Sequence, residues 1–594
     1  MRNPKIIVVG GGLAGLMATI RVAEAGVPVD LFSIVPVKRS HSVCAQGGIN
    51  AAKNQKGEGD TTWKHFDDTI YGGDFLANQP LVKRMCEAAP GIIDLLDRMG
   101  VMFNRTAEGL LDYRRFGGTL YNRTAFAGAT TGQQLLYALD EQVRRHESEG
   151  KVKKFEGFTF LSAVIDDAGV CRGICAMDLR SMEVKTFPAD AVIFCTGGIG
   201  AIFGKSTNSV VCTGSAQSAL FQQGVDYANG EFIQVHPTAI PGEDKLRLMS
   251  ESARGEGGRV WVPRNPADQR PAKSIPEKER FYFLEEWYPK YGNLVPRDIA
   301  TRAIHRIVYQ EKLGLDGKAA VYLDVSHIPR ETLDRKLEGI LEIYEKFLGV
   351  DPREEPMKVF PGMHYTMGGM WVNAEDQATS VPGIFAAGEC EYQYHGANRL
   401  GANSLVSCIF GGGIAGPSAV KYAKNLDKSA EAAQSVVYDR ERKRQEEKNR
   451  ALISQDGSEN PLTIWRELGE IMTEHVTVTR INKDLQKACG ALQELEARYR
   501  RINLSDRTAW SNQTLNFARE LGNMLILARV ITMGACARNE SRGAHYKPEF
   551  PERDDANWLK TTRAKWNGGD IQLTYEPVDI SLIPPRVRKY DAAK

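Results

Sequence analysis

Five short polar segments carry the side chains best suited to bind and transform a small anion. They are residues 234–238, 250–258, 296–298, 364–369 and 395–405. Arg399 offers a planar guanidinium that matches a carboxylate. His236, Ser250 and His364 can donate hydrogen bonds to the same kind of group. Each segment alone also has an ordinary explanation, such as a turn histidine before proline. Their chemistry therefore depends on elements that bring them together.

The first of these elements is a strand, tight turn and helix at the N-terminus. Residues 6–9, which follow Lys5, are apolar and β-branched, and they lead into Gly10-x-Gly12-x-x-Gly15 and a helical run that ends at Gly26. This pattern predicts a dinucleotide site, with the glycines close to a pyrophosphate at the helix N-terminus. Ser33 ends the second strand, where an acidic residue more often holds a ribose, so the fingerprint is incomplete.

Two later segments repeat the pattern of an apolar strand that runs into glycine. Residues 191–198 end in Thr196-Gly197-Gly198, and residues 381–389 end in Gly388-Glu389. Glycine at a strand end lets the backbone approach a ligand closely. Residues 241–356 lie between these segments and differ from them in composition, with a stretch rich in proline and charged residues at 263–286. We therefore expect a discontinuous cofactor domain with a second domain inserted into it.

The remaining regions are assigned by their periodicity. Residues 61–100 predict amphipathic helices, and short alternating runs between 155 and 190 predict a β-meander. From about residue 425 the chain is helical and highly charged, with one apolar stripe formed by Leu485, Cys489, Leu492 and Leu495. The tail from 546 to 594 is less regular.

Composition excludes several classes of protein. The 594 residues carry a formal charge of +2, so bulk charge implies neither nucleic acid nor an anionic membrane as a partner. The apolar run at 404–420 is interrupted by four glycines, and we expect no membrane span or secretory signal. None of the ten cysteines forms a C-x-x-C pair, so we expect a reducing compartment and no iron–sulfur cluster in this chain, and we assign no residue to a metal site.

A small polar loop follows the second predicted strand. It reads Ser40-His41-Ser42-Val43-Cys44-Ala45-Gln46-Gly47-Gly48-Ile49, and the residues alone allow either a solvated loop or one that wraps a cofactor. Together with the N-terminal glycines, it resembles the flavoprotein subunits of succinate dehydrogenase and fumarate reductase. The resemblance implies that the cofactor is FAD and that His41 is bonded covalently to its 8α-methyl group. The implied FAD-binding residues are Gly10, Gly12, Gly15, Ser33, His41, Ser42, Gln46, Gly47, Gly48, Thr196, Gly197, Gly198, Glu389, Arg399, Ser404 and Leu405.

The resemblance also implies the fold, which is α/β. We expect a discontinuous Rossmann-like FAD-binding domain at residues 1–240 and 357–424, with an inserted α+β capping domain at 241–356 that closes over the substrate. A helical domain at 425–540 and a small C-terminal domain at 541–594 follow.

The implied reaction interconverts succinate and fumarate by hydride transfer between flavin and one carbon, while a proton leaves or joins the other. His236, Ser250, Glu251, His364 and Arg399 are the implied dicarboxylate ligands, with Phe116 shaping the pocket floor.

The resemblance assigns proton transfer to Arg297, with Glu251 and Arg254 as a relay. A guanidinium resists deprotonation, with a pKa above about 12. Side-chain chemistry alone favours His236 or His364 for this role.

Partners follow from the resemblance as well. Electrons would pass to an iron–sulfur subunit and on to a quinone through a membrane anchor, which would place the chain peripherally on the cytoplasmic face of the cell membrane. The Cys44–Gly48 variant and Thr213-Gly214-Ser215, which replaces the commoner Thr-Gly-Asp-Gly, resemble a bacterial branch with a di-haem cytochrome b anchor.

Three alternatives share parts of this pattern. L-Aspartate oxidase has the same fold and many of the motifs but lacks the tethering histidine. Soluble fumarate reductases carry extra haem or flavin domains. A non-catalytic subunit that only retains FAD would not need Arg297, His364 and Arg399 together.

Overall fold

The computed structural model describes residues 4–242 and 245–590. Its N-terminal sheet has five strands, all paired in parallel, in the order β19-β10-β1-β2-β6. These strands are Ile384–Ala386 (β19), Ala191–Phe194 (β10), Ile6–Val9 (β1), Val29–Ser33 (β2) and Val152–Glu156 (β6). Strands β10 and β1 at the centre are apolar throughout because both faces of a parallel sheet are covered. Segments far apart in the chain meet in one sheet, as predicted for a discontinuous domain.

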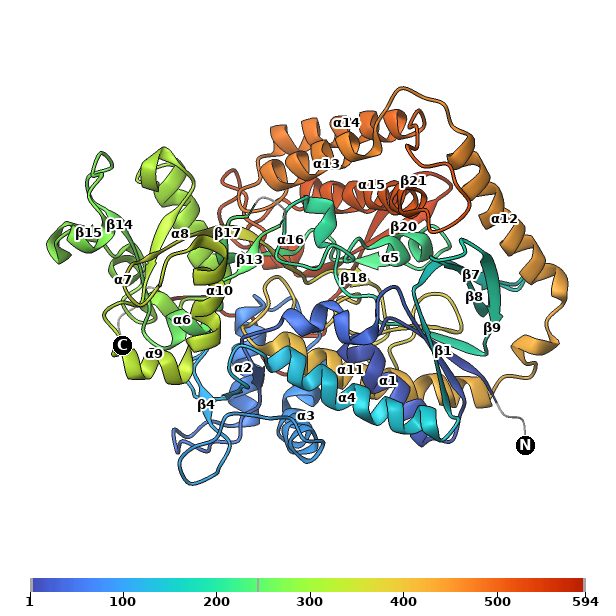
Figure 1. The fold of residues 1–594 in the computed structure, drawn as a ribbon, viewed down its shortest axis with the longest axis horizontal. Helices are drawn as coiled ribbons and strands as arrows, with labels where there is room; N and C mark the ends of the chain where they lie inside the picture. Colours follow the sequence, from blue (N-terminus) through green and yellow to red (C-terminus); the bar gives the residue numbers. More distant parts are fainter. Residues whose placement is uncertain (1–3, 243–244, 591–594) are drawn as a thin grey trace.

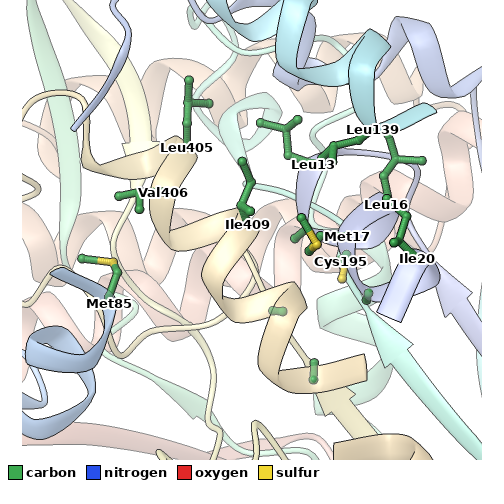
Figure 2. Packing of buried hydrophobic residues seen from close by; sticks show 14 of the residues in the cluster. Leu13, Leu16, Met17, Ile20, Met85, Leu139, Cys195, Leu405, Val406 and Ile409 are labelled. Carbon is green, nitrogen blue, oxygen red and sulfur yellow. The ribbon is translucent and has the colours of Figure 1, made fainter. Parts of the chain in front are cut away.

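Two helices pack tightly beside this sheet. Helix α1 (Leu13–Glu24) contacts α11 (Asn403–Lys424), and their apolar side chains share one core (Figures 1 and 2). A Cβ added at Gly412 would lie 2.3 Å from the carbonyl oxygen of Ala14. The glycines that interrupt the apolar run at 404–420 thus let α11 approach α1 closely.

Further helices and short strands occur between residues 37 and 221. Helix α4 packs against both α1 and η2. The elements are η1 (Val37–Arg39), η2 (His41–Cys44), β3 (Ile49–Asn50), α2 (Thr62–Gly72), α3 (Gln79–Arg98), β4 (Tyr113–Arg114), β5 (Thr124–Ala125), α4 (Thr131–Ser148), η3 (Gly200–Phe203) and α5 (Ser215–Phe221). The predicted meander is confirmed as an antiparallel sheet of β7 (Phe158–Ile165), β8 (Cys171–Asp178) and β9 (Val184–Pro188).

The inserted segment forms a unit with its own core, at the left of Figure 1. A six-stranded sheet in the order β13-β12-β17-β16-β14-β15 supports it. The strands are β12 (Ile233–Ile240), β13 (Arg247–Leu248), β14 (Arg259–Pro263), β15 (Arg280–Phe281), β16 (Val321–Asp324) and β17 (Met357–Thr366). The helices are α6 (Ser252–Gly255), α7 (Phe283–Trp287), α8 (Arg297–Tyr309), α9 (Arg330–Lys336) and α10 (Glu338–Leu348). Strands β12 and β17 join this sheet from outside 241–356, and the domain bounds stay a proposal.

Four long helices form the next region, at the top and right of Figure 1. They are α12 (Ser435–Ser454), α13 (Pro461–His475), α14 (Asn482–Tyr499) and α15 (Gln513–Ala537). The three leucines of the predicted stripe on α14 are buried, whereas Cys489 is half-buried. Among the described residues, α15 alone is long and apolar enough to cross a membrane, but it packs in the core against α13 and α14.

The C-terminal region is more regular than its sequence suggests. Strands β20 (Lys560–Asn567) and β21 (Asp570–Pro577) form a hairpin that joins β11 (Tyr227–Ala228) and β18 (Gly369–Met370) in one sheet. Gly568 and Gly569 supply the positive φ angles, 61° and 120°, that the turn requires. The hairpin ties the end of the chain to the middle of the FAD-binding region.

Candidate functional site

The glycine turn after β1 is built for close backbone approach. Gly10 has φ of 116°, and an added Cβ would lie 2.1 Å from the carbonyl oxygen of Cys195. An added Cβ at Gly15 would lie 1.8 Å from the carbonyl oxygen of Gly10, so this glycine serves packing. Gly12 begins α1 without a side-chain cap. Apart from the N–H of Leu13, which donates to Ser42 Oγ, the first N–H groups of α1 are therefore available to a phosphate.

One cavity of about 510 Å³ runs from this turn to the inserted unit. All residues named above as site residues line it except Gly15, Gly198 and Arg254. Several buried polar atoms on its walls have no hydrogen-bond partner among the described residues: Ser40 Oγ, Gln46 Oε1, Thr196 Oγ1, His236 Nε2 and Arg399 Nε. Buried polar groups are normally satisfied. The cavity thus fits a large polar ligand with phosphates, such as FAD, and a smaller anion.

Gly15, Gly198 and Arg254 do not line the cavity but pack against residues that do. Gly15 packs beneath the turn. An added Cβ at Gly198 would lie 2.4 Å from Glu389 Oε1, so that glycine leaves room for the carboxylate. Burial raises the pKa of Glu389 to about 7, against the backbone N–H of Thr366 and the charge of Arg399, which lower it. Arg254 is buried and pairs with Glu251.

His41 lies where η2 meets the cavity. The backbone N–H of Ser209 donates to His41 Nδ1 at 3.1 Å, and the Asn208 side chain lies 3.2 Å from Nε2. Burial and then the charge of Lys245 lower the pKa of His41 to about 4, so the ring is neutral at pH 7. Ser42 Oγ accepts from the N–H of Leu13 at 3.3 Å and connects this loop to α1.

Glu520 and Lys245 are among the cavity residues that the sequence did not indicate. Glu520 reaches the cavity from α15, and burial raises the pKa of its carboxyl to about 7. Lys245 donates to the carbonyl oxygen of Asn208 at 2.9 Å, close to His41. Neither belongs to a motif. Glu520 is the one carboxylate in the mostly apolar helix α15, and that is the signal that could have identified it.

The other end of the cavity holds the proposed dicarboxylate ligands. The rings of His236 and His364 lie 5.0 Å apart, and the Arg399 guanidinium lies 4.3 Å from the ring centre of Tyr365. Burial and then Arg297 hold the pKa of both histidines well below the usual range. Both rings are therefore neutral hydrogen-bond donors or acceptors. Burial, then Arg297, lowers the pKa of Arg399 to about 9, as expected of a cation without a paired anion.

Arg297, Glu251 and Arg254 form one continuous charged contact. Arg297 Nε and Nη2 lie 3.0 and 2.9 Å from Glu251 Oε2, and Arg254 Nη2 lies 2.7 Å from Oε1. Arg297 Nη1 also donates to Gln234 Oε1 at 3.0 Å. Burial would raise the pKa of Glu251, but Arg297 and Arg254 outweigh it and the net shift is downward. Glu251 is therefore ionised.

The charges of this end do not balance. Arg254, Arg297 and Arg399 carry three positive charges, Glu251 supplies one negative charge, and Glu389, whose pKa is about 7, supplies at most one more. A buried excess of one to two positive charges is unfavourable unless a ligand offsets it. A small dianion does so, and the planar fork of Arg399 matches a carboxylate. The fold and the site thus define an oxidoreductase that binds FAD beside a dianionic substrate.

Comparisons with known proteins give the family. A model of an FAD binding domain matches residues 5–405, and one of the fumarate reductase flavoprotein C-terminal region matches 465–590. The chain is 63% identical to the succinate dehydrogenase flavoprotein subunit of Bacillus subtilis (strain 168), over 100% of both chains. It is 35% identical to the fumarate reductase flavoprotein subunit of Escherichia coli (strain K12), over 98% of this chain and 95% of that one.

Solved structures support the same family. A chain of E. coli quinol fumarate reductase superposes with a TM-score of 0.91 at 32% identity, covering 100% of this chain and 99% of that one. A quinol-fumarate reductase with menaquinol molecules gives 0.89 at 32% identity, covering 99% and 100%. The chain belongs to the succinate dehydrogenase and fumarate reductase flavoprotein family. The predicted family, fold class, FAD and succinate–fumarate chemistry are confirmed, and the alternatives are not favoured.

Proposed function

We propose that this chain is the flavoprotein subunit of a membrane-bound complex that exchanges electrons between succinate and a quinone. Arg399, His236, His364 and Ser250 bind the dicarboxylate, and Phe116 closes the pocket floor. When bound, FAD supplies the hydride acceptor or donor. The observation that carries the proposal is the contact of Arg297 and Arg254 with Glu251. It lies at the end of the cavity where positive charges exceed negative ones and where a dianion can bind.

Arg297 is the proposed proton-transfer residue. The side chains of His236 and His364 are suited to binding, because buried neutral imidazoles beside guanidinium groups resist protonation. Arg297 touches the ionised Glu251 through two nitrogens, so a proton that leaves Arg297 can be replaced along Glu251 and Arg254. Arg254 also donates to the carbonyl oxygen of Asn293 at 2.7 Å, which fixes its guanidinium at the outer end of this contact. Arg297 thus acts as a conduit rather than a resting base.

Two variants test this role. Arg297→Gln removes the proton carrier and one positive charge, whereas Arg297→Lys keeps the charge but cannot span both Glu251 and Gln234. Positioned proton transfer typically contributes about 10²- to 10⁴-fold to a rate. We expect turnover of succinate to fall by that range in both variants, while malonate still perturbs the flavin spectrum. Near-normal turnover in either variant would remove Arg297 from the role.

Covalent attachment of FAD at His41 is the second part of the proposal. The N–H of Ser209 points at Nδ1, which therefore acts as an acceptor, so Nε2 is the nitrogen that would carry a substituent once the Asn208 side chain, 3.2 Å from it, turns away. A neutral imidazole alkylated on Nε2 has this arrangement. An imidazole on the 8α carbon withdraws electron density and raises the flavin potential, which a weak reductant such as succinate requires. A fluorescent flavin band on a denaturing gel tests the bond.

The partners form the third part. The 63% identical relative is named a subunit, and one similar structure contains menaquinol, so a multi-chain quinone-linked assembly is supported. We propose an iron–sulfur subunit and a membrane anchor of the di-haem cytochrome b type, with this chain peripheral on the cytoplasmic face. Purification of the native complex through a tag on this chain, followed by iron and haem analysis, tests the assignment. Purification without iron or haem would contradict it.

A further inference from the structure

The last described residues of the chain cross from one part of the fold to another. Figure 1 shows the β20–β21 hairpin beside the helical region, well away from the cap helices α9 and α10. Beyond β21 the chain first fixes itself to α3. Gln79 Oε1 accepts the N–H groups of Leu582 and Ile583 at 3.0 and 2.8 Å, and Gln79 Nε2 donates to the Ile583 carbonyl at 2.7 Å. Ile583 is buried in the core around the parallel sheet.

The next residues contact α2. Arg586 pairs with Asp67 at 2.6 Å, and its guanidinium lies 4.9 Å from the ring centre of Tyr71. The Tyr71 hydroxyl lies 3.3 Å from the carbonyl oxygen of Lys589 and accepts the N–H of the same residue. The segment 578–590 is therefore held along the FAD-binding region by both backbone and side chain.

Its end is buried in the capping unit. Tyr590 is 4% exposed and belongs to the cap core, with its ring 5.1 Å from that of Tyr291 and 5.5 Å from that of Tyr71. One segment thus contributes Ile583 to the core of the FAD-binding region and Tyr590 to the core of the cap.

Arg588 lies between these two anchors and joins both units by charge. Its Nη1 lies 2.9 Å from Asp298 Oδ2 and 3.4 Å from Asp74 Oδ2, and Nη2 lies 3.3 Å from Asp298 Oδ1. Asp298 is in the first turn of α8, next to Arg297, and is 4% exposed. Asp74 follows α2 and is 5% exposed. Burial lowers the pKa of Arg588, but Asp298 and Asp74 outweigh it, and the net shift is upward.

We propose that residues 578–590 form a strap that holds the cap closed, and that Arg588 is the positioning residue that fixes the first turn of α8 and with it Arg297. Arg588 can pair with Asp298 and Asp74 together only when the cap and the FAD-binding region lie as they do here. The strap therefore stabilises the arrangement in which Arg297 faces the dicarboxylate ligands. This role rests on the proposed proton transfer by Arg297, but the closure itself does not.

The chain offers a matched control. Arg588→Gln removes the buried positive charge that joins Asp298 of the cap to Asp74 of the FAD-binding region. Arg586→Gln makes the same chemical change two residues away, at a side chain that is 45% exposed and contacts the FAD-binding region alone. In the FAD-loaded protein we expect Arg588→Gln to lower kcat about 10- to 100-fold and to raise the Kd for malonate. We expect Arg586→Gln to change neither.

Hydrogen–deuterium exchange distinguishes closure from proton transfer. In Arg588→Gln the amides of the first turn of α8 should exchange at least tenfold faster, and saturating malonate should restore protection because the ligand closes the cap. A residue of purely structural importance would not show recovery with ligand. The double variant Asp298→Asn/Arg588→Gln should lose no more protection at α8 than the single variant that loses more. Both substitutions break the same ion pair, so their effects should not add.

Each result of these experiments either supports or overturns the strap. Wild-type exchange at α8 in Arg588→Gln would overturn the strap. If that variant does not retain flavin, Arg588→Lys, which keeps the charge but not the forked contact with Asp298, replaces it under the same criterion. If Arg297→Gln proves active, the proton role fails, while faster exchange at α8 in the strap variant would still support closure.

Discussion

Replacement of Arg399 is the sharpest test of how the site recognises its substrate. The guanidinium packs on Tyr365, its Nε has no hydrogen-bond partner among the described residues, and its pKa is depressed by burial and Arg297. The backbone is held independently, because Gln234 Nε2 donates to the Arg399 carbonyl at 2.8 Å. A substitution therefore changes the side chain without displacing the loop.

The magnitude follows from the two hydrogen bonds that a forked guanidinium donates to a carboxylate. Each charged hydrogen bond contributes about 1.5–3 kcal/mol. Loss of both in Arg399→Gln should lower kcat/KM for succinate by about 10²- to 10⁴-fold, whereas Arg399→Lys, which keeps the charge and one bond, should lose about 10- to 100-fold. Dye-linked succinate oxidation measures both. A lysine variant with wild-type kcat/KM would refute forked recognition at this residue.

Three further changes have distinct signatures. His41→Ala should retain FAD without a covalent bond and lose succinate oxidation more than fumarate reduction, and equal losses would contradict the role of the bond in raising the flavin potential. Gly10→Ala should abolish flavin binding, because the new Cβ would overlap the Cys195 carbonyl at a φ of 116°; bound flavin after purification would disprove it. Burial and then Arg123 lower the pKa of His65 to about 3, so stability should be lost as pH falls from 6.5 towards 3. His65→Gln should remove about 2 kcal/mol of that loss between pH 7 and pH 5, measured from urea midpoints.

Local motifs predicted the parts of the site that depend on backbone geometry. The tight turn requires the glycines at 10, 12 and 15, so they are recognisable as a local motif. The loop that carries His41 is likewise one continuous stretch of the chain. The polar clusters around His236, Ser250, Arg297 and Arg399 were identifiable because each is compact. The structure then placed them on one cavity, which no local pattern could have shown.

What escaped prediction comes from distant elements. Glu520 reaches the cavity from a helix more than 300 residues after Ser33, and its role is visible once α15 is packed. The β20–β21 hairpin was missed although Ile571, Leu573 and Tyr575 alternate with polar residues in β21, and its place in the sheet depends on the long-range pairing of β20 with β11. The contacts of Arg588 likewise join Asp74 and Asp298 across 514 and 290 positions. Long-range pairing of this kind leaves little trace in a single sequence.

The most direct test of the central claim is a single turnover under anaerobic conditions. Addition of succinate to the purified FAD-loaded chain should bleach its flavin absorbance, fumarate should restore it, and malonate should prevent the bleaching. Arg297→Gln should bind malonate and remain unbleached on the same timescale. A wild-type flavin that succinate does not reduce, in a protein that retains FAD, would contradict the account.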